Sequence, residues 1–354
     1  MLENITVVDF STLLPGPYAT LRLADMGATV IKIEPPGGDP ARSIGPVAQG
    51  TSLVFLAYNR KKTSVMLNLK DESDRNQALS MIRTADVVIE GFRPGVADRL
   101  GIGYDTANLI NPRIVYCSLT GYGQTGSMTQ QAGHDLNYLA VSGILSQLVD
   151  HHNQPIVPNL QLADLLGGIV AVEAILAALI SRHHSGHGQH LDMAITDALI
   201  GLLGGHAAIQ KHTGYPHGVA ELAGTIICYN LYTTLDNRLV SLAALELKFW
   251  TTFCQAVNRP EWIAHQTSPA ELSNPIYREM VTLFHKRPLS WWHRFSAQVD
   301  CCLQPVLEVH EALASPLATE RDLVGVEQTS LGTFSYATTG AGGCQTRAYG
   351  STST

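Results

Sequence analysis

Two acid–base residues stand at the starts of apolar segments that have helical spacing. His134 follows the glycine-rich stretch "GYGQTG" (121–126), and Asp164 lies in "NLQLADLLGG" (159–168). Free N–H groups at a helix N-terminus favour negative charge. Bases at two neighbouring helix starts could therefore face one carbon atom from opposite sides and move a proton there, while backbone N–H groups stabilise an enolate oxygen.

A structural interpretation competes with this chemistry at each position. Asp135, which follows His134 directly, and Asp164 could simply cap helices, a common role of aspartate. Glu246 in "SLAALELKFW" (241–250) lies between an apolar strand pattern and an aromatic-rich helix pattern. It could be a helix N-terminal residue, or it could orient a histidine through a hydrogen bond, as the acid of a catalytic triad does. Spacing alone leaves both interpretations open.

Nucleotide and metal chemistry find little support in the sequence. The turn "STLLPGPYAT" (11–20) holds only Gly16, so the G-x-G-x-x-G pattern is absent, although Glu34 ends the second expected strand where a ribose-binding acid would stand. The histidines in "HHSGHGQH" (183–190) follow an expected helix and are typical of a solvated C-terminal turn. None of the 6 cysteines forms a C-x-x-C pair. We therefore expect no bound metal and no separate cofactor.

The elements that must position these residues alternate between strands and helices in the first third of the chain. Apolar, β-branched runs predict strands at 5–10, 29–35, 63–69, 86–92 and 113–123, and helical spacing predicts helices at 18–28 and 72–85. Such alternation indicates a parallel sheet with right-handed crossovers. This α/β part should carry the loops from which His134 and Asp164 project.

The rest of the chain predicts more helices and a smaller α+β part. Helices are expected at 135–148, 160–182, 192–213, 248–257, 275–287 and 289–298, and strands at 225–234 and 238–245. We infer a large α/β domain (1–190), a linker helix region (191–224), a small α+β domain (225–300), a return segment to the large domain (301–333) and a tail (334–354). The tail is rich in Gly, Thr and Ser and is expected to be loosely ordered.

Composition limits the partners and the compartment. The chain has 354 residues, 45% hydrophobic and 15% charged, with a formal net charge of −7. Its densest basic run is only "NRKK" (59–62), and its longest apolar run (165–180) contains Glu173 and is too short for a membrane span. No signal peptide is evident at the start. We expect a cytoplasmic protein with reduced cysteines that binds neither nucleic acid nor membranes.

Several ordered motifs together resemble a known family. They are "DFSTLLPGPYATLRLADMGATVIKIEPPGGD" (9–39), "EGFRPGVADRLGIGY" (90–104), "SLTGYGQTGSMTQQAGHDLNYLAVSGILS" (118–146), "LADLLGG" (162–168) and "ALELKFW" (244–250). Over roughly residues 1–325 the chain resembles the family III CoA-transferases, also called the CaiB/BaiF family. The version "AGHDLNY" (132–138) is most similar to the α-methylacyl-CoA racemase branch.

The resemblance implies roles for individual residues. In racemases of the family, the residues that match His134 and Asp164 are the two acid–base groups, and the one that matches Glu246 supports the histidine. In the transferases, the residue that matches Asp164 is the nucleophile that forms an acyl anhydride. Contacts to coenzyme A, as part of the substrate, are implied for Asn68, Leu69, Lys70, Asp71, Arg93, Gly133, Asp135, Leu136, Asn137 and Tyr138.

The resemblance also implies a fold and an assembly. The family has a large Rossmann-like parallel-sheet domain and a smaller α+β domain. Two chains interlock as a homodimer, with the active site between the large domain of one and the small domain of the other. This chain departs from the racemase pattern at Pro35, where racemases often carry an arginine, and it lacks the family's charged ending after about residue 333. Lys32, Arg60, Lys61 or Lys62 could supply the missing phosphate contact.

The leading hypothesis is therefore an acyl-CoA racemase that interconverts (R)- and (S)-2-methyl-branched thioesters by 1,1-proton transfer through an enolate. His134 and Asp164 would exchange the proton and Glu246 would orient His134. The alternative is a CoA-transferase in which Asp164 forms an aspartyl acyl anhydride. A third possibility is a chain that binds acyl-CoA without turning it over.

Overall fold

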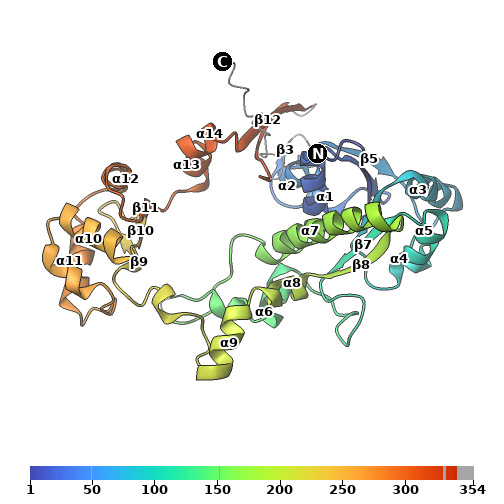
Figure 1. Ribbon diagram of the computed structural model, residues 1–354. Helices are drawn as coiled ribbons and strands as arrows, with labels where there is room; N and C mark the ends of the chain where they lie inside the picture. The colour runs from blue at the N-terminus through green and yellow to red at the C-terminus, as the bar shows by residue number, and fades with distance from the viewer. Residues whose placement is uncertain (49, 151, 330–331, 341–354) are drawn as a thin grey trace, which may run out of the picture. The chain divides into compact units, whose positions relative to one another are not determined.

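The computed structural model describes residues 1–48, 50–150, 152–329 and 332–340, and its chain forms two compact units. One unit comprises Met1–Leu203 together with the described residues from Pro316 onward, and the other comprises Gly204–Ser315 (Figure 1). The first unit has a parallel sheet between helices, and the second has a small antiparallel sheet with helices. The predicted combination of a large α/β part and a small α+β part is confirmed.

A six-stranded sheet organises the first unit, with the strand order β5-β2-β1-β6-β7-β8. Its strands are β1 (Thr6–Asp9), β2 (Thr29–Glu34), β5 (Lys62–Met66), β6 (Val87–Glu90), β7 (Val115–Thr120) and β8 (Gln189–Ala194), and all neighbours pair in parallel. Every residue of β6 and β7 is buried, as expected for a sheet that has helices on both faces. The strand order reverses between β1 and β6, and ligands commonly bind outside the carboxyl ends of the strands at such a point.

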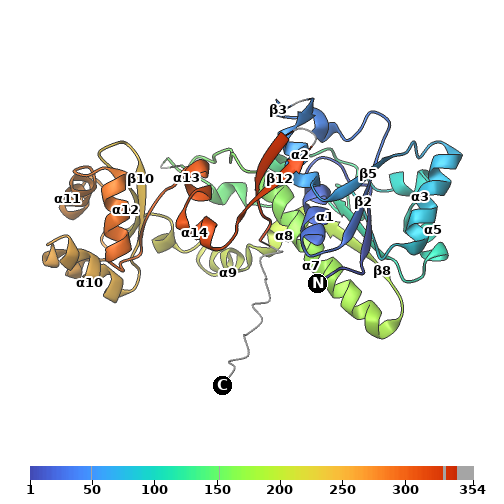
Figure 2. The ribbon, with the colours of Figure 1, turned by 90° about the horizontal axis from the view of Figure 1, so that it is seen from above.

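Helices cover both faces of this sheet (Figure 2). One face packs against α1 (Pro15–Asp25), α6 (Asp135–Val141), α7 (Leu162–Ser185) and α8 (Ile195–Gly201). The other packs against α3 (Glu72–Thr84), α4 (Val96–Arg99) and α5 (Tyr104–Ile110). Successive strand residues therefore alternate between two cores: Val7 belongs to the first and Val8 to the second.

Helix α7 is long and apolar, and it packs in the core of the first unit. By length and composition alone it could cross a membrane, but Ala171, Val172 and Ile175 are buried in the core of the first unit. A side chain at Gly168 would come within 2.8 Å of the carbonyl oxygen of Pro15, and one at Gly167 would come equally near Ile195. These glycines let α7 approach the starts of α1 and α8 closely, which brings the N-terminus of α7 to the carboxyl edge of the sheet.

The second unit is built around aromatic side chains. A three-stranded antiparallel sheet has the order β11 (Leu303–Pro305), β10 (Leu239–Ala243) and β9 (Tyr229–Thr233). Helices α10 (Leu247–Ala256), α11 (Pro275–Phe284) and α12 (Leu289–Gln298) contribute to its core. The largest fully buried side chains of this core are Trp250, Trp262, Trp292, Tyr232, Phe253 and Phe284. This unit therefore has a hydrophobic core of its own.

The remaining elements are short. They are β3 (Val47–Ala48), β4 (Thr51–Ser52), α2 (Leu53–Asn59), α9 (Gly204–Thr213), α13 (Val309–Leu313), α14 (Pro316–Glu320), β12 (Val324–Thr329), β13 (Gly332–Ala337) and the 3₁₀ turns Pro40–Ser43, Leu145–Gln147, Ala220–Leu222 and Pro260–His265. The sequence patterns did not predict α2, α4 or α5.

Three expectations about the elements were wrong. The helix expected at 192–213 begins instead with β8, because Gln189–Ala194 pairs along β7 and completes the sheet. The helix expected at 135–148 ends at Val141, where Ser142 and the positive-φ Gly143 stop it. Loose order was expected from residue 334, but residues 334–337 lie in β13, which pairs with β12. Residues 341–354 of that tail lie outside the described residues.

The observed units also move two expected boundaries. Residues 191–203, expected to begin a linker, belong to the first unit because β8 and α8 do. The chain returns to that unit at Pro316 and not near residue 301, because Leu303 pairs with Leu242 of β10 in the second unit.

Candidate active site

A cavity of about 290 Å³ opens at the carboxyl edge of the parallel sheet, where the strand order reverses. Its walls come from the turns after β1, β6 and β7 and from the starts of α6, α7 and α8. Among the residues predicted to bind or react with substrate, the cavity brings together Arg93, Gly133, His134, Tyr138 and Asp164. The topology therefore joins residues that are 71 positions apart in sequence, Arg93 and Asp164, in one wall.

Asp164 lies in the first turn of α7 in an environment that disfavours its ionised form. Burial is the main reason that the pKa of Asp164 is raised to about 7, and the negative charge of Asp135 adds to the effect. The two residues also touch, because Asp135 Oδ1 accepts a hydrogen bond of 3.0 Å from the backbone N–H of Asp164. Asp135 therefore caps the start of α7, and Asp164 can gain and lose a proton near neutral pH.

His134 is the N-cap residue of α6 and has extended backbone geometry. Its backbone N–H donates to Asn137 Oδ1 at 3.0 Å, so the asparagine fixes the backbone from which the imidazole projects. The residue is exposed and lines the same cavity as Asp164. His134 and Asp164 thus line one cavity from the starts of two helices, and their roles in proton transfer remain a prediction.

Two glycines near His134 make room for tyrosine rings. A Cβ atom at Gly121 would lie 2.3 Å from Cε1 of Tyr138, and one at Gly133 would lie 2.7 Å from the same atom. The Tyr138 hydroxyl donates to the carbonyl oxygen of Gly133 at 2.6 Å, and its ring meets Tyr122 edge to face at 5.3 Å. Burial and the charge of Asp164 raise the pKa of Tyr138 to about 12, so the hydroxyl stays protonated. The two glycines therefore leave space for the Tyr138 ring, whose hydroxyl hydrogen-bonds the residue before His134.

The turn between β1 and α1 forms a wall that the sequence analysis did not assign to the site. Ser11, Thr12, Leu13, Pro15 and Gly16 all line the cavity. A signal for this was available, because this turn follows the first strand of a doubly wound sheet. The missing dinucleotide glycine pattern makes that signal weak in the sequence.

The predicted coenzyme A contacts divide into those inside and those outside the cavity. Arg93 is exposed in the turn after β6 and lines it. Leu136 and Asn137 are exposed on the first turn of α6 and are not part of its lining. Asn68, Leu69, Lys70 and Asp71 follow the edge strand β5, and the Asp71 carboxylate caps α3 by accepting from the N–H groups of Ser73 and Asp74. These four residues do not line the cavity either.

Glu246 belongs to the second unit, where it is the N-cap residue of α10. Its side chain is exposed and makes no capping hydrogen bond within the described part of the chain. Its carbonyl oxygen accepts from the N–H groups of Phe249 and Trp250. The expected role of Glu246 in orienting His134 remains a prediction.

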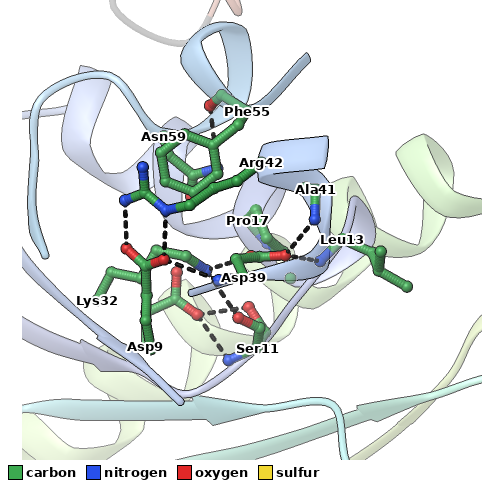
Figure 3. A network of polar contacts seen from close by, with 12 residues as sticks. Asp9, Ser11, Leu13, Pro17, Lys32, Asp39, Ala41, Arg42, Phe55 and Asn59 are labelled. Carbon is green, nitrogen blue, oxygen red and sulfur yellow. Dashed lines mark hydrogen bonds and ion pairs between the residues drawn. The ribbon is translucent and has the colours of Figure 1, made fainter. Parts of the chain in front are cut away.

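The basic residues suggested as a substitute phosphate site pair with acidic side chains instead. Figure 3 shows Lys32 beside Asp39. The side chains of Lys32 and Lys62 are fully buried and pair with Asp39 and Asp9 at 2.9 and 3.2 Å. Arg60 forms a buried two-bond pair with Asp25, which Lys61 also contacts at 2.9 Å. The suggestion that they replace the arginine missing at Pro35 is therefore wrong for Lys32, Arg60 and Lys62, because acidic side chains already occupy them.

A smaller cavity of about 140 Å³ adjoins the first and shares Arg93 and Pro94 with it. Glu90 lies in its wall, and burial raises the pKa of Glu90 to about 6. His190 Nε2 lies 2.9 Å from Ser118 Oγ, and its ring stacks on Tyr104. The expectation of a turn is wrong for His190, because it lies in β8, although its side chain is exposed. His183, His184 and His187 are exposed at and just after the end of α7, as expected for a solvated turn.

Known proteins share both the sequence and the fold. The model of CoA-transferase family III matches residues 2–346. Acetyl-CoA:oxalate CoA-transferase of Acetobacter aceti is 33% identical over 333 residues, which cover 91% of this chain and 85% of that protein. Alpha-methylacyl-CoA racemase of Homo sapiens is 30% identical over 321 residues, covering 88% and 79%. A solved CAIB/BAIF family protein from Brucella suis has a TM-score of 0.84 at 27% identity and covers 95% of this chain and 91% of its own.

Proposed function

The chain belongs to CoA-transferase family III, and we propose that it is an isomerase of that family which interconverts the (R) and (S) forms of 2-methyl-branched acyl-CoA thioesters. The observation that carries this proposal is the placement of His134 and Asp164 in the wall of one cavity. Inversion at a carbon atom by proton transfer needs one group to remove the proton and another to return it on the opposite face. A nucleophilic mechanism at Asp164 would have no need of the imidazole.

The pKa of Asp164 suits a group that removes a proton from one enantiomer and returns a proton to the other. With a pKa of about 7, it is present as carboxylate and as carboxylic acid in comparable amounts near neutral pH. For one enantiomer the carboxylate removes the α-proton and the imidazolium of His134 returns one; for the other enantiomer the roles reverse. A general acid or base works best when its pKa lies near the working pH.

The thioester oxygen becomes negatively charged as the α-proton leaves, and the start of α1 can stabilise it. Pro15 and Pro17 carry no N–H group, and the N–H of Tyr18 donates to the Leu14 carbonyl at 2.8 Å. Among the first three residues of α1, Gly16, which lines the cavity, is therefore the one that has a backbone N–H to offer. Donors fixed in advance where charge develops are a large source of catalysis.

Coenzyme A would be held outside the reacting centre. Arg93 is exposed at the cavity, where a guanidinium can bind a phosphate through two hydrogen bonds. Lys70 is exposed after β5 and can meet a more distant phosphate. Glu246 would approach His134 in an interlocked homodimer of the kind the family resemblance implies. A monomer in light scattering would contradict that shared site.

Solvent deuterium exchange at the α-carbon tests the proposal directly. Separate (R)- and (S)-2-methylacyl-CoA esters are incubated in deuterium oxide, and isotope and configuration are followed by mass spectrometry and chiral chromatography. Wild type should exchange and invert both. His134→Ala should abolish exchange from one enantiomer, and Asp164→Asn should abolish it from the other. Absence of exchange across short, branched and steroid-like esters would rule the isomerase out.

Similarity to an acetyl-CoA:oxalate CoA-transferase supports a second candidate, transfer of coenzyme A between carboxylic acids. An oxygen of the Asp164 carboxylate would bond to the thioester carbonyl carbon, the C–S bond would break, and coenzyme A would leave as thiolate. The thiolate would then attack the aspartyl carbonyl carbon of the anhydride, which releases the first acid as its carboxylate and leaves an aspartyl thioester of coenzyme A. The carboxylate of the second acid would attack this thioester and displace the thiolate, forming a second anhydride. Attack of the thiolate on the acyl carbonyl carbon of that anhydride would form the second CoA ester and restore the Asp164 carboxylate. Hydroxylamine trapping, or an acyl mass increase on Asp164 with acyl-CoA alone, would favour transfer over isomerisation.

A further inference from the structure

The turn of residues 11–13, between β1 and α1, has a backbone that its sequence does not favour. Leu13 has a φ of 66°. In this left-handed region the Cβ atom of an L-residue crowds the following carbonyl oxygen, so leucine seldom adopts it. All three residues line the cavity in which acyl-CoA is proposed to react. Something outside the turn must hold it in this conformation.

The side chains of Asp39 and Lys32 each bond to a backbone group of the turn, and Asp9 also accepts from the N–H of Ser11 (Figure 3). The backbone N–H of Leu13 donates to Asp39 Oδ1 at 3.1 Å. The carbonyl oxygen of Ser11 accepts from Lys32 Nζ at 2.8 Å. Lys32 Nζ also lies 2.9 Å from Asp39 Oδ2, so these two side chains form an ion pair with each other. Both ends of the turn are thus tied to β2 and to the segment that follows it.

Neighbouring groups also hold Asp39 in place. The Asp39 carboxylate also accepts from the N–H of Ala41 at 2.8 Å, and the Asp39 N–H donates to Glu34 Oε2 at 2.8 Å. Arg42 binds Glu34 through two hydrogen bonds of 2.7 Å. Asp39 is therefore held by contacts outside the turn, and its carboxylate in turn fixes the ammonium group of Lys32, which makes the pair a rigid support.

Stability alone does not account for this arrangement. The side chains of Lys32 and Asp39 are fully buried, as are those of Asp9 and Lys62 beside them. Removing charges from water costs about as much as the ion pair returns, and replacing such a pair by apolar residues is often neutral. Buried pairs are better explained where they fix a geometry, and here the geometry is that of an active-site wall.

We propose that Asp39 and Lys32 are positioning residues that hold the 11–13 turn in the left-handed conformation required for the wall of the acyl site. Neither residue lines the cavity; both act through the backbone of the turn. The same turn leads into Gly16, the donor assigned to the thioester oxygen. The inference rests on the proposed function for its catalytic consequence, but not for the conformation that the pair maintains.

The test removes the pair as a unit. Lys32→Met combined with Asp39→Ala deletes one cation and one anion, and leaves Asp9 paired with Lys62, so no buried charge is orphaned. The matched control is Arg60→Met with Asp25→Ala, which removes another buried pair of the first unit, one that makes no contact with the 11–13 turn. Asp39→Asn serves as a milder variant in case the double variant does not fold, as judged by near-ultraviolet circular dichroism.

Two measurements are made on each folded variant: amide hydrogen exchange at Leu13, and kcat and KM for α-proton exchange. In the Lys32/Asp39 variant we expect exchange at Leu13 to accelerate at least about tenfold while the helices stay protected. We expect kcat to fall roughly 30- to 100-fold with KM within about threefold of wild type, because a shift of about 1 Å in a catalytic wall has that effect. The control should keep kcat and Leu13 exchange within about threefold of wild type.

The outcomes separate this proposal from the proposed function. If Leu13 exchange and kcat are unchanged in the double variant, or in Asp39→Asn where only that folds, the positioning role is refuted. Equal losses in the control and the test variant would also refute it, since they would indicate general destabilisation. If wild type shows no α-proton exchange, the proposed function fails, and the Leu13 measurement still decides whether the pair holds the turn.

Discussion

Asp135→Asn isolates the electrostatic part of the environment of Asp164. The carbonyl oxygen of an asparagine can accept the same hydrogen bond from the Asp164 N–H that Asp135 Oδ1 accepts now, so the start of α7 stays capped. The substitution removes only the negative charge that, after burial, contributes to the raised pKa of Asp164. Burial, the larger cause, is unchanged.

The expected change in the pKa of Asp164 is therefore the contribution of the Asp135 charge alone. One charge a few ångströms away in a half-buried site contributes about 1.4 kcal/mol, which is a factor of about ten in a proton equilibrium. We therefore expect the pKa of Asp164 to fall from about 7 to about 6. At pH 6 the ionised fraction then rises from about 9% to about 50%, and the rate at which Asp164 removes a proton rises about fivefold.

The assay is the pH dependence of kcat/KM for deuterium incorporation, measured separately for each enantiomer between pH 5 and 9. The acidic limb should move to lower pH for the enantiomer whose proton Asp164 removes. Glu72→Gln is the control, since it makes the same change of net charge at the exposed start of α3. If the acidic limb of neither enantiomer moves, or if the control moves it equally, the pKa assignment to Asp164 is wrong.

Three further outcomes are expected. Gly121→Ala should lower the free energy of unfolding by about 1–3 kcal/mol and also lower kcat, because the new methyl group displaces Tyr138. A thermal melt and the deuterium exchange assay measure the two effects, and an unchanged melt would contradict the tight contact. Arg93→Gln should raise KM for acyl-CoA roughly ten- to hundredfold with little change in kcat, and a proportionate loss of kcat instead would place Arg93 in the chemistry. Asp164→Asn should reduce the loss of folding stability that occurs as pH rises. The pKa of Asp164 is about 7 in the folded protein and near 3.8 in the unfolded chain, so the proton on Asp164 stabilises the fold fully below pH 3.8, and this contribution is lost as pH rises through 7. Thermal melts of wild type and variant from pH 4 to 8 would detect the difference.

Much of the fold follows from local patterns. The runs "ITVVDF" (5–10) and "TVIKIEP" (29–35) are rich in β-branched residues and became β1 and β2, because a strand buried on both faces needs apolar side chains throughout. Strand β8 escaped prediction because "QHLDMA" (189–194) begins with two polar residues and continues directly into an apolar helical pattern. Only pairing with β7 makes it a strand, and that partner is more than 60 residues away in sequence.

The candidate site was predicted in its parts and not in its assembly. Sequence placed His134 and Asp164 at helix starts, which the structure confirms, but it could not tell whether Asp135 or Asp164 acts as a cap. The hydrogen bond from the Asp164 N–H to Asp135 settles that, and it depends on two helices meeting. The raised pKa of Asp164 likewise depends on burial, which no local pattern specifies.

By itself, then, the sequence determined the alternation of strands and helices, the positions of His134 and Asp164 at helix starts and the membership in the family, because these depend on short-range spacing and on residue identity. Only the tertiary structure decided whether Lys32 and Lys62 are available to bind a phosphate. In the sequence Lys32 and Lys62 read as part of a basic patch for phosphate, but strand pairing buries them opposite Asp39 and Asp9. The cause is that an ion pair inside a protein is formed by side chains that the fold brings together from distant positions, and their spacing along the chain carries no sign of it.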